Sequence, residues 1–108
     1  MSDSPGTAGR APGGALTIAT APGDVLAFVP ADPVVTTAGS IALSFRNGST
    51  LAHNLVFTDG LSAATRAIVE PGTDDNLLLE PNGPGAYRFV CTIHDGMAGV
   101  LLVEAPAP

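Results

Sequence analysis

Four side chains with sulfur or nitrogen donor atoms could together bind a metal ion. Cys91, His94 and Met97 fall within seven residues, and His53 lies far upstream after a polar turn. They are the chain's one cysteine, both of its histidines and its one methionine beyond Met1. Two imidazoles, a thiolate and a weak thioether form the ligand set of a copper electron-transfer centre. The spacing therefore predicts that these four side chains bind one copper ion.

Each of these residues also has a plainer interpretation when it is taken alone. A cysteine at the end of a strand is commonly a small core residue, and a methionine commonly fills gaps in a core. A lone histidine is commonly a surface or hydrogen-bonded residue. For the site to be accidental, all of these plainer interpretations would have to be true at once in one short chain. The Cys-x2-His-x2-Met spacing with an upstream histidine therefore favours a copper site over this coincidence.

The elements that must position these residues are predicted to be β-strands. Short apolar runs are interrupted every eight to twelve residues by Gly, Pro, Asn or Asp, which is typical of an all-β sandwich or barrel. Residues 61–70 are ambiguous and could form a helical turn that leads into a strand. The expected strands are 16–20, 25–29, 41–46, 53–58, 66–69, 76–79, 86–91 and 99–104. The copper-binding loop would then connect the last two strands through a turn at Asp95-Gly96.

Segment 85–97 (GAYRFVCTIHDGM) resembles the ligand loop of the cupredoxins, the type 1 blue copper proteins. Its two-residue gaps are similar to those of amicyanin, whereas plastocyanin usually has a longer loop. Segment 47–54 (NGSTLAHN) resembles the segment that carries the first ligand of the family. The resemblance spans residues 15–104 and implies a Greek-key β-sandwich of about eight strands with copper at one end.

The resemblance also implies a role for each ligand. Cys91 would supply the thiolate, His53 and His94 the equatorial nitrogens, and Met97 the axial sulfur. His94 would be the ligand at the solvent edge, through which electrons leave. Asn54 matches the position that ties the two ligand loops together and braces the cysteine sulfur.

Two positions depart from the amicyanin-type loop, which tends to carry proline where this chain has Ile93 and Asp95. Neither position is a ligand, so the departures affect the reduction potential and the choice of partner. The backbone N–H of Ile93 is expected to point at the Cys91 sulfur and to raise the potential. The charge of Asp95 would favour Cu(II) and lower it.

The composition and the flanks of the cysteine exclude several classes of function. With ten Asp and Glu, four Arg and a net charge of −6, the chain is a poor match for nucleic acid or anionic lipid. Cys91 is flanked by Val90 and Thr92, so no adjacent histidine could bridge to further copper ions as in a multicopper enzyme. We therefore expect a non-enzymatic electron carrier with redox protein partners. A copper-storage or copper-delivery protein and a metal-free interaction module are the alternatives.

The organisation of the chain is predicted to be simple. Residues 1–14 are expected to be a flexible linker or the stub of a trimmed export or anchor segment, 15–105 a cupredoxin domain and 106–108 a disordered tail. No apolar run is long enough to span a bilayer. A monomer in the periplasm or on the extracellular face of the cell membrane is expected.

Overall fold

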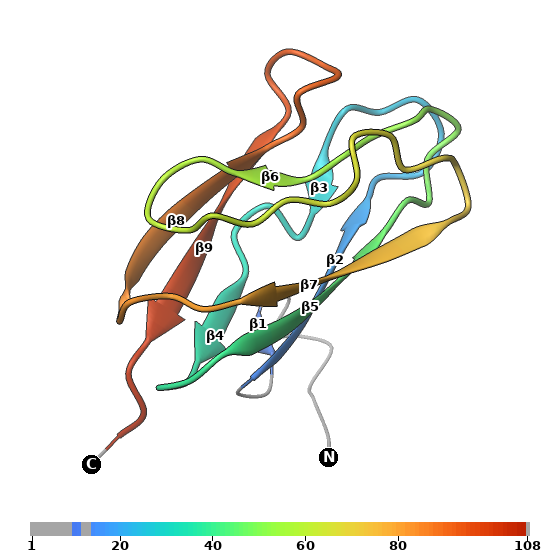
Figure 1. Cartoon of the computed structure of the whole chain (residues 1–108). Helices are drawn as coiled ribbons and strands as arrows, with labels where there is room; N and C mark the ends of the chain where they lie inside the picture. The colour runs from blue at the N-terminus through green and yellow to red at the C-terminus, as the bar shows by residue number, and fades with distance from the viewer. Residues whose placement is uncertain (1–9, 12–13, 108) are drawn as a thin grey trace.

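A computed structural model describes residues 10–11 and 14–107, which form nine β-strands and, within those residues, no helix (Figure 1). Most of the predicted linker 1–14 and the final residue of the predicted tail 106–108 therefore lie outside the described residues. The strands are β1 (Arg10–Ala11), β2 (Ala15–Thr20), β3 (Phe28–Val29), β4 (Val34–Thr36), β5 (Ile41–Arg46), β6 (Val56–Phe57), β7 (Asp74–Leu79), β8 (Gly85–Val90) and β9 (Ala98–Glu104).

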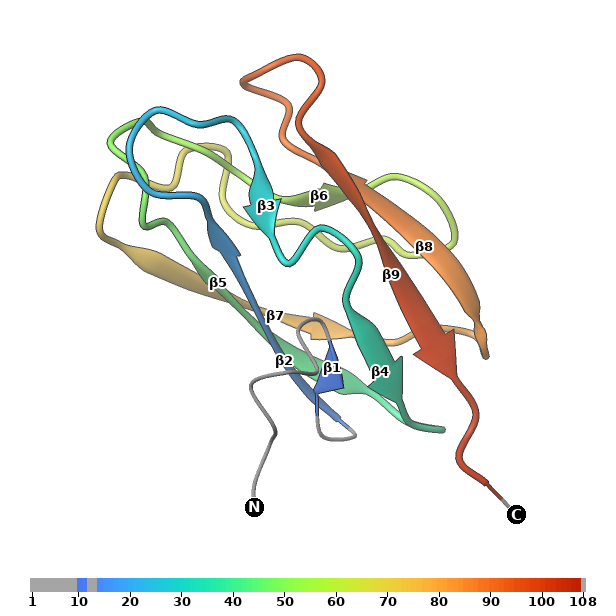
Figure 2. The same ribbon diagram turned by 180° about the vertical axis from the view of Figure 1, so that it is seen from behind.

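The strands form two mixed sheets that face each other as a sandwich (Figures 1 and 2). One sheet has the order β1-β4-β9-β8-β6, and the other has the order β3-β2-β5-β7. Strands β8 and β9 form an antiparallel hairpin, whereas β2 pairs with β5 and β4 pairs with β9 in parallel. The prediction of an all-β sandwich is confirmed.

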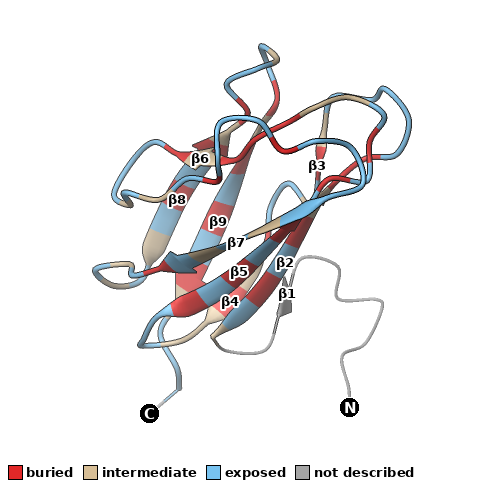
Figure 3. Ribbon diagram, turned by 45° about the vertical axis from the view of Figure 1, so that its right-hand side comes forward, coloured by how far each residue is buried: buried red, intermediate tan, exposed pale blue. Residues whose placement is uncertain are grey.

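The core fills the space between the two sheets, because alternate side chains of the long strands point inwards. Along β5, buried and exposed residues alternate without interruption, and β8 shows the same period near Phe89 (Figure 3). Phe89 packs against Phe28 with ring centroids 5.0 Å apart and against Phe57 with centroids 5.5 Å apart. A Cβ atom at position 99 would collide with the Phe89 ring, so β9 passes over this cluster at Gly99.

Three of the predicted strands differ from the structure because their residues do not alternate between two faces. In the expected strand 53–58, residues 53–55 are buried in succession, and only β6 is regular strand. Residues 66–68 are exposed in succession, so 66–69 is no strand, although Val69 pairs with His53 in an isolated bridge. Of the expected strand 25–29 only β3 is formed, because residues 25 and 26 are both exposed and do not alternate between two faces. The ambiguous segment 61–70 contains neither a helix nor a regular strand.

The side chain of Asn47 organises the loop that follows β5. It is fully buried, and its Oδ1 accepts hydrogen bonds from Thr20 Oγ1 (2.9 Å) and from the Ser49 amide (3.0 Å). Its Nδ2 donates to the carbonyl oxygens of Leu51 (2.9 Å) and Val69 (2.8 Å). One side chain therefore joins β2, the loop 47–53 and the segment that ends at Val69.

We predict that Asn47→Ala lowers the free energy of unfolding by about 2–4 kcal/mol, because the Thr20 hydroxyl and the Ser49 amide lose their buried acceptor and the Leu51 and Val69 carbonyls each lose a donor. Urea denaturation of the metal-free protein measures this change.

Asn82→Ala is the matched control, because it removes the same amide group from an exposed position. It should change the free energy of unfolding by less than about 0.5 kcal/mol. Equal losses from the two variants would contradict the role given to Asn47.

Candidate metal centre

The four predicted ligands come from two loops at one end of the sandwich. His53 lies in the connection between β5 and β6, Cys91 directly follows β8, and His94 and Met97 lie in the loop that leads into β9 (Figure 1). The amide of Cys91 donates to the carbonyl of Met97 at 2.9 Å, which closes this loop. The fold thus brings His53, distant in sequence, to the loop that holds the other three.

The Cys91 thiol and the two imidazoles are close neighbours. Cys91 Sγ lies 3.8 Å from His53 Nδ1, and the ring centroids of His53 and His94 are 4.8 Å apart with an interplanar angle of 56°. His53 is fully buried, Met97 is 1% exposed and Cys91 is 5% exposed, whereas His94 is only half-buried. Three of the predicted residues are therefore screened from water, and His94 lies at the edge.

Hydrogen bonding fixes which nitrogen of His53 carries the proton. His53 Nε2 lies 3.1 Å from Ser49 Oγ. The Ser49 hydroxyl has one proton, and it donates that proton to the Gly23 carbonyl at 2.9 Å. Ser49 Oγ must therefore accept from His53, so the proton is on Nε2 and the lone pair of Nδ1 faces the Cys91 sulfur.

Hydrogen bonding also fixes the tautomer of His94. Its Nε2 lies 3.1 Å from the carbonyl oxygen of Ala52, which can only accept a hydrogen bond. Nε2 of His94 therefore carries the proton, and Nδ1 is its lone-pair nitrogen. Both histidines thus keep Nδ1 as the free donor atom, and an oxygen from the loop 47–53 holds each opposite nitrogen.

The environment of His53 also favours the neutral imidazole that a metal requires. Burial away from water lowers the pKa of His53 below its usual value, and the neighbouring His94 lowers it further. A proton therefore competes weakly for this nitrogen near neutral pH.

The types of the four predicted donor atoms suit a soft metal, but only His53 and Cys91 have donor atoms in direct contact. Among residues 10–11 and 14–107, no three His, Cys, Asp or Glu side chains form a compact metal-binding group. His53 and Cys91 are in place, His94 is tied to Ala52 through Nε2, and the fourth predicted donor is a thioether. Two imidazoles, a thiol and a thioether fit Cu(I) and Cu(II) better than a hard cation, which prefers oxygen ligands.

Asn54 joins the two loops that carry the predicted ligands. Its Oδ1 accepts from the Thr92 amide at 2.8 Å, and its Nδ2 donates to Thr92 Oγ1 at 2.7 Å. The same Nδ2 also donates to the Ala67 carbonyl at 3.0 Å. Asn54 therefore holds the residue next to His53 against the residue next to Cys91. These bonds are consistent with the predicted tie between the two loops, and the bracing of the Cys91 sulfur stays a prediction.

The roles suggested for Ile93 and Asp95 remain predictions. Both residues are exposed on the loop, and Ile93 is 38% exposed. Among the described residues, no hydrogen bond joins the Ile93 amide to the Cys91 sulfur. The bonds that brace the loop run through Asn54 and Thr92.

Sequence reasoning missed the residues that orient the histidines. Asn47, Ser49 and Ala52 were recognised only as part of segment 47–54, which resembles the family's first-ligand segment, and no hydrogen-bonding role was assigned to them. Ser49 precedes His53 by four residues outside any helix, so no periodicity connects the two side chains. The resemblance of segment 47–54 to the first-ligand segment drew attention to this loop, but it did not indicate which of its atoms hold the histidines.

Residues 13–103 match the family described as "Cupredoxin-like domain", so the chain belongs to the cupredoxin-like family. An auracyanin from the photosynthetic bacterium Roseiflexus castenholzii, reduced with dithionite, is similar in structure with a TM-score of 0.70 and 26% identity, covering 91% of this chain and 100% of that chain. Auracyanin B has a TM-score of 0.71 and 20% identity, covering 94% of this chain and 91% of that chain.

A variant of amicyanin in its reduced Cu(I) form at pH 4 has a TM-score of 0.65 and 22% identity, covering 84% of this chain and 83% of that chain. No curated protein matches the chain by sequence. In the described part of the chain, no helix is of a length and apolarity to traverse a membrane.

We predict that Ser49→Ala releases the tautomer of His53. Without the hydroxyl, the buried Nε2–H loses its acceptor, and the loss of about 1–2 kcal/mol should appear both as a mixed tautomer and as lower stability. Long-range proton–nitrogen NMR spectra of the metal-free protein report the tautomer, and urea denaturation reports the stability.

Thr50→Ala is the matched control, because Thr50 Oγ1 donates to the same Gly23 carbonyl at 3.0 Å but is exposed. It should leave His53 in the single Nε2–H form. An unchanged His53 spectrum in Ser49→Ala would contradict the assignment.

Proposed function

We propose that this protein is a type 1 (blue) copper protein that carries single electrons between redox partners. His53, Cys91, His94 and Met97 hold its one copper ion. When bound, copper supplies a site that accepts and returns one electron. The observation that carries the proposal is the buried contact of 3.8 Å between Cys91 Sγ and His53 Nδ1, in which the lone pair of the imidazole faces the sulfur.

The residues around the site suit rapid electron transfer because they limit rearrangement. Ser49 and the Ala52 carbonyl hold the Nε2 atoms of the two imidazoles, so neither ring has to change tautomer when it binds metal. Asn54 and Thr92 tie the two ligand loops together. The burial of His53 and Met97 excludes water from most of the ligand set.

The exposure of the loop residues supports a carrier with protein partners. His94 is the one predicted ligand that is only half-buried, and Ile93 beside it is exposed. Electrons would therefore enter and leave through the edge formed by this loop. We further propose that the protein works in the periplasm or on the extracellular face of the cell membrane, as a monomer and not as an enzyme.

Titration of the metal-free protein with Cu(II), followed by its visible spectrum and by voltammetry, tests the proposal. We expect an intense thiolate-to-copper absorption at one equivalent and a reversible one-electron couple. A colourless or weakly coloured complex without such a couple would contradict the electron-carrier function. It would favour the alternative of copper storage or delivery.

We predict that Cys91→Ser abolishes the intense band and leaves the sandwich folded. A serine hydroxyl cannot supply the charge-transfer donor, and Cys91 contributes one small side chain to a large core. Circular dichroism checks the fold, and the visible spectrum checks the site.

Met97→Leu is the control, because it removes the other predicted sulfur ligand and keeps the thiol. Its copper complex should retain an intense band. A Cys91→Ser variant that stays intensely coloured would show that Cys91 is not the thiolate ligand.

A further inference from the structure

The chain contains two Asn-Gly dipeptides, Asn47-Gly48 and Asn82-Gly83, in opposite environments. In this dipeptide, the backbone nitrogen of glycine can attack the side-chain carbonyl carbon of asparagine, because glycine has no side chain to hinder the approach. The reaction needs a free glycine N–H and a mobile asparagine side chain. The structure therefore allows the reactivity of the two sites to be compared.

Asn47-Gly48 is protected on both counts. The Asn47 amide is fully buried and engaged in four hydrogen bonds. The attacking nitrogen is occupied as well, because the Gly48 amide donates to Thr20 Oγ1 at 3.0 Å. Attack at this site would require the loop to open first.

Asn82-Gly83 lies open in the connection between β7 and β8. Asn82 is exposed, and among the described residues no hydrogen bond reaches its side chain or the Gly83 amide. Gly83 has a φ angle of 157°, and no heavy atom lies within 4 Å of the place where a Cβ would stand. In the described part of the chain, no hydrogen bond therefore restrains either reacting group.

We propose that Asn82 is a site of spontaneous deamidation. The Gly83 nitrogen forms a bond to Asn82 Cγ and loses its proton, and the side-chain nitrogen leaves as ammonia, which gives a succinimide. Water then opens the ring at either carbonyl and leaves aspartate or isoaspartate. No oxidant or reductant is needed. The net charge of the product is one unit more negative than the −6 of the original chain.

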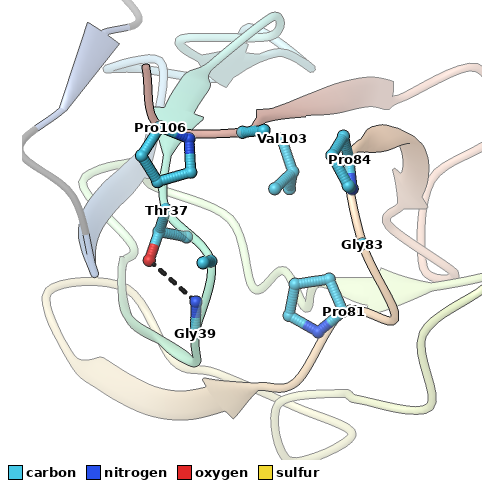
Figure 4. A pocket seen from close by; sticks show the side chains of 9 residues that line it. Thr37, Gly39, Pro81, Gly83, Pro84, Val103 and Pro106 are labelled. Atoms are coloured by element: carbon cyan, nitrogen blue, oxygen red, sulfur yellow. Dashed lines mark hydrogen bonds between the residues drawn. The ribbon is translucent and has the colours of Figure 1, made fainter. Parts of the chain in front are cut away.

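The two products should affect the fold differently. The Gly83 carbonyl accepts the hydrogen bond from the Tyr87 hydroxyl at 2.7 Å. The Tyr87 ring packs closely against Gly60, because a Cβ added to Gly60 would lie within 3 Å of the ring. Gly83 also lies between Pro81 and Pro84 on the rim of a pocket whose opposite side includes Thr37 and Gly39 (Figure 4). Isoaspartate adds an atom to the main chain before Gly83 and displaces this carbonyl, whereas aspartate adds only charge.

The test is incubation of the full chain at mildly alkaline pH, followed by tryptic digestion and mass spectrometry. Cleavage after Arg46, Arg66 and Arg88 places Asn47 in peptide 47–66 and Asn82 in peptide 67–88. In the folded protein we expect peptide 67–88 to gain one dalton at Asn82, partly as isoaspartate, at a rate at least roughly tenfold above that of Asn47. In denaturant, both sites should react.

The variant Asn82→Gln should remove the modification from peptide 67–88, because glutamine would have to form a larger ring. Asn82→Asp should melt like the unmodified protein, whereas the isoaspartate form should melt at a lower temperature. An unreacted Asn82 in the folded chain, or equal rates at Asn82 and Asn47, would overturn the proposal. The experiment does not depend on copper, so it is independent of the proposed function.

Discussion

The arrangement of the candidate metal centre depends on the need to satisfy the buried polar groups of one loop. Asn47 bonds the backbone of the loop at Ser49 and Leu51 and links it to Val69. Because that backbone is fixed, the Ser49 hydroxyl donates to Gly23 and can only accept from His53. A series of hydrogen bonds between uncharged groups thus determines which nitrogen of the buried His53 ring carries the lone pair. Without the hydrogen bond to Ser49, neither ring nitrogen of His53 would be preferred as the metal ligand.

The second ligand loop is held by the strands and by a single amide side chain. Strand β8 pairs with β9 along its whole length, and the bond from Cys91 to the Met97 carbonyl extends this pairing into the loop. Asn54 then fastens the loop to the segment of His53 through Thr92. The predicted ligands are therefore supported by two layers of bonds that exist before any metal binds. This support limits how far the two loops that carry the predicted ligands can move.

The sequence was sufficient to predict what depends on residue type and short-range pattern. Strands such as β5 follow from the alternation of apolar residues, and the cluster of Cys91, His94 and Met97 is visible as a spacing. The segment around His53 was predicted as a strand, but His53 and the two residues after it are all buried. Three successive buried residues do not fit a strand whose side chains alternate between a buried and an exposed face. The contacts of Ser49 and Asn47 were also missed. They join residues of several segments, and their donor and acceptor roles become apparent only in three dimensions.

X-ray absorption at the copper edge tests the central claim most directly. The protein should be loaded with one equivalent of copper and measured in the oxidised and reduced states at one mildly alkaline pH. We predict that copper shows one thiolate sulfur ligand and two imidazole nitrogen ligands, and that these ligands are the same in both oxidation states. A spectrum with only oxygen and nitrogen ligands, or the loss of one imidazole on reduction at that pH, would contradict it.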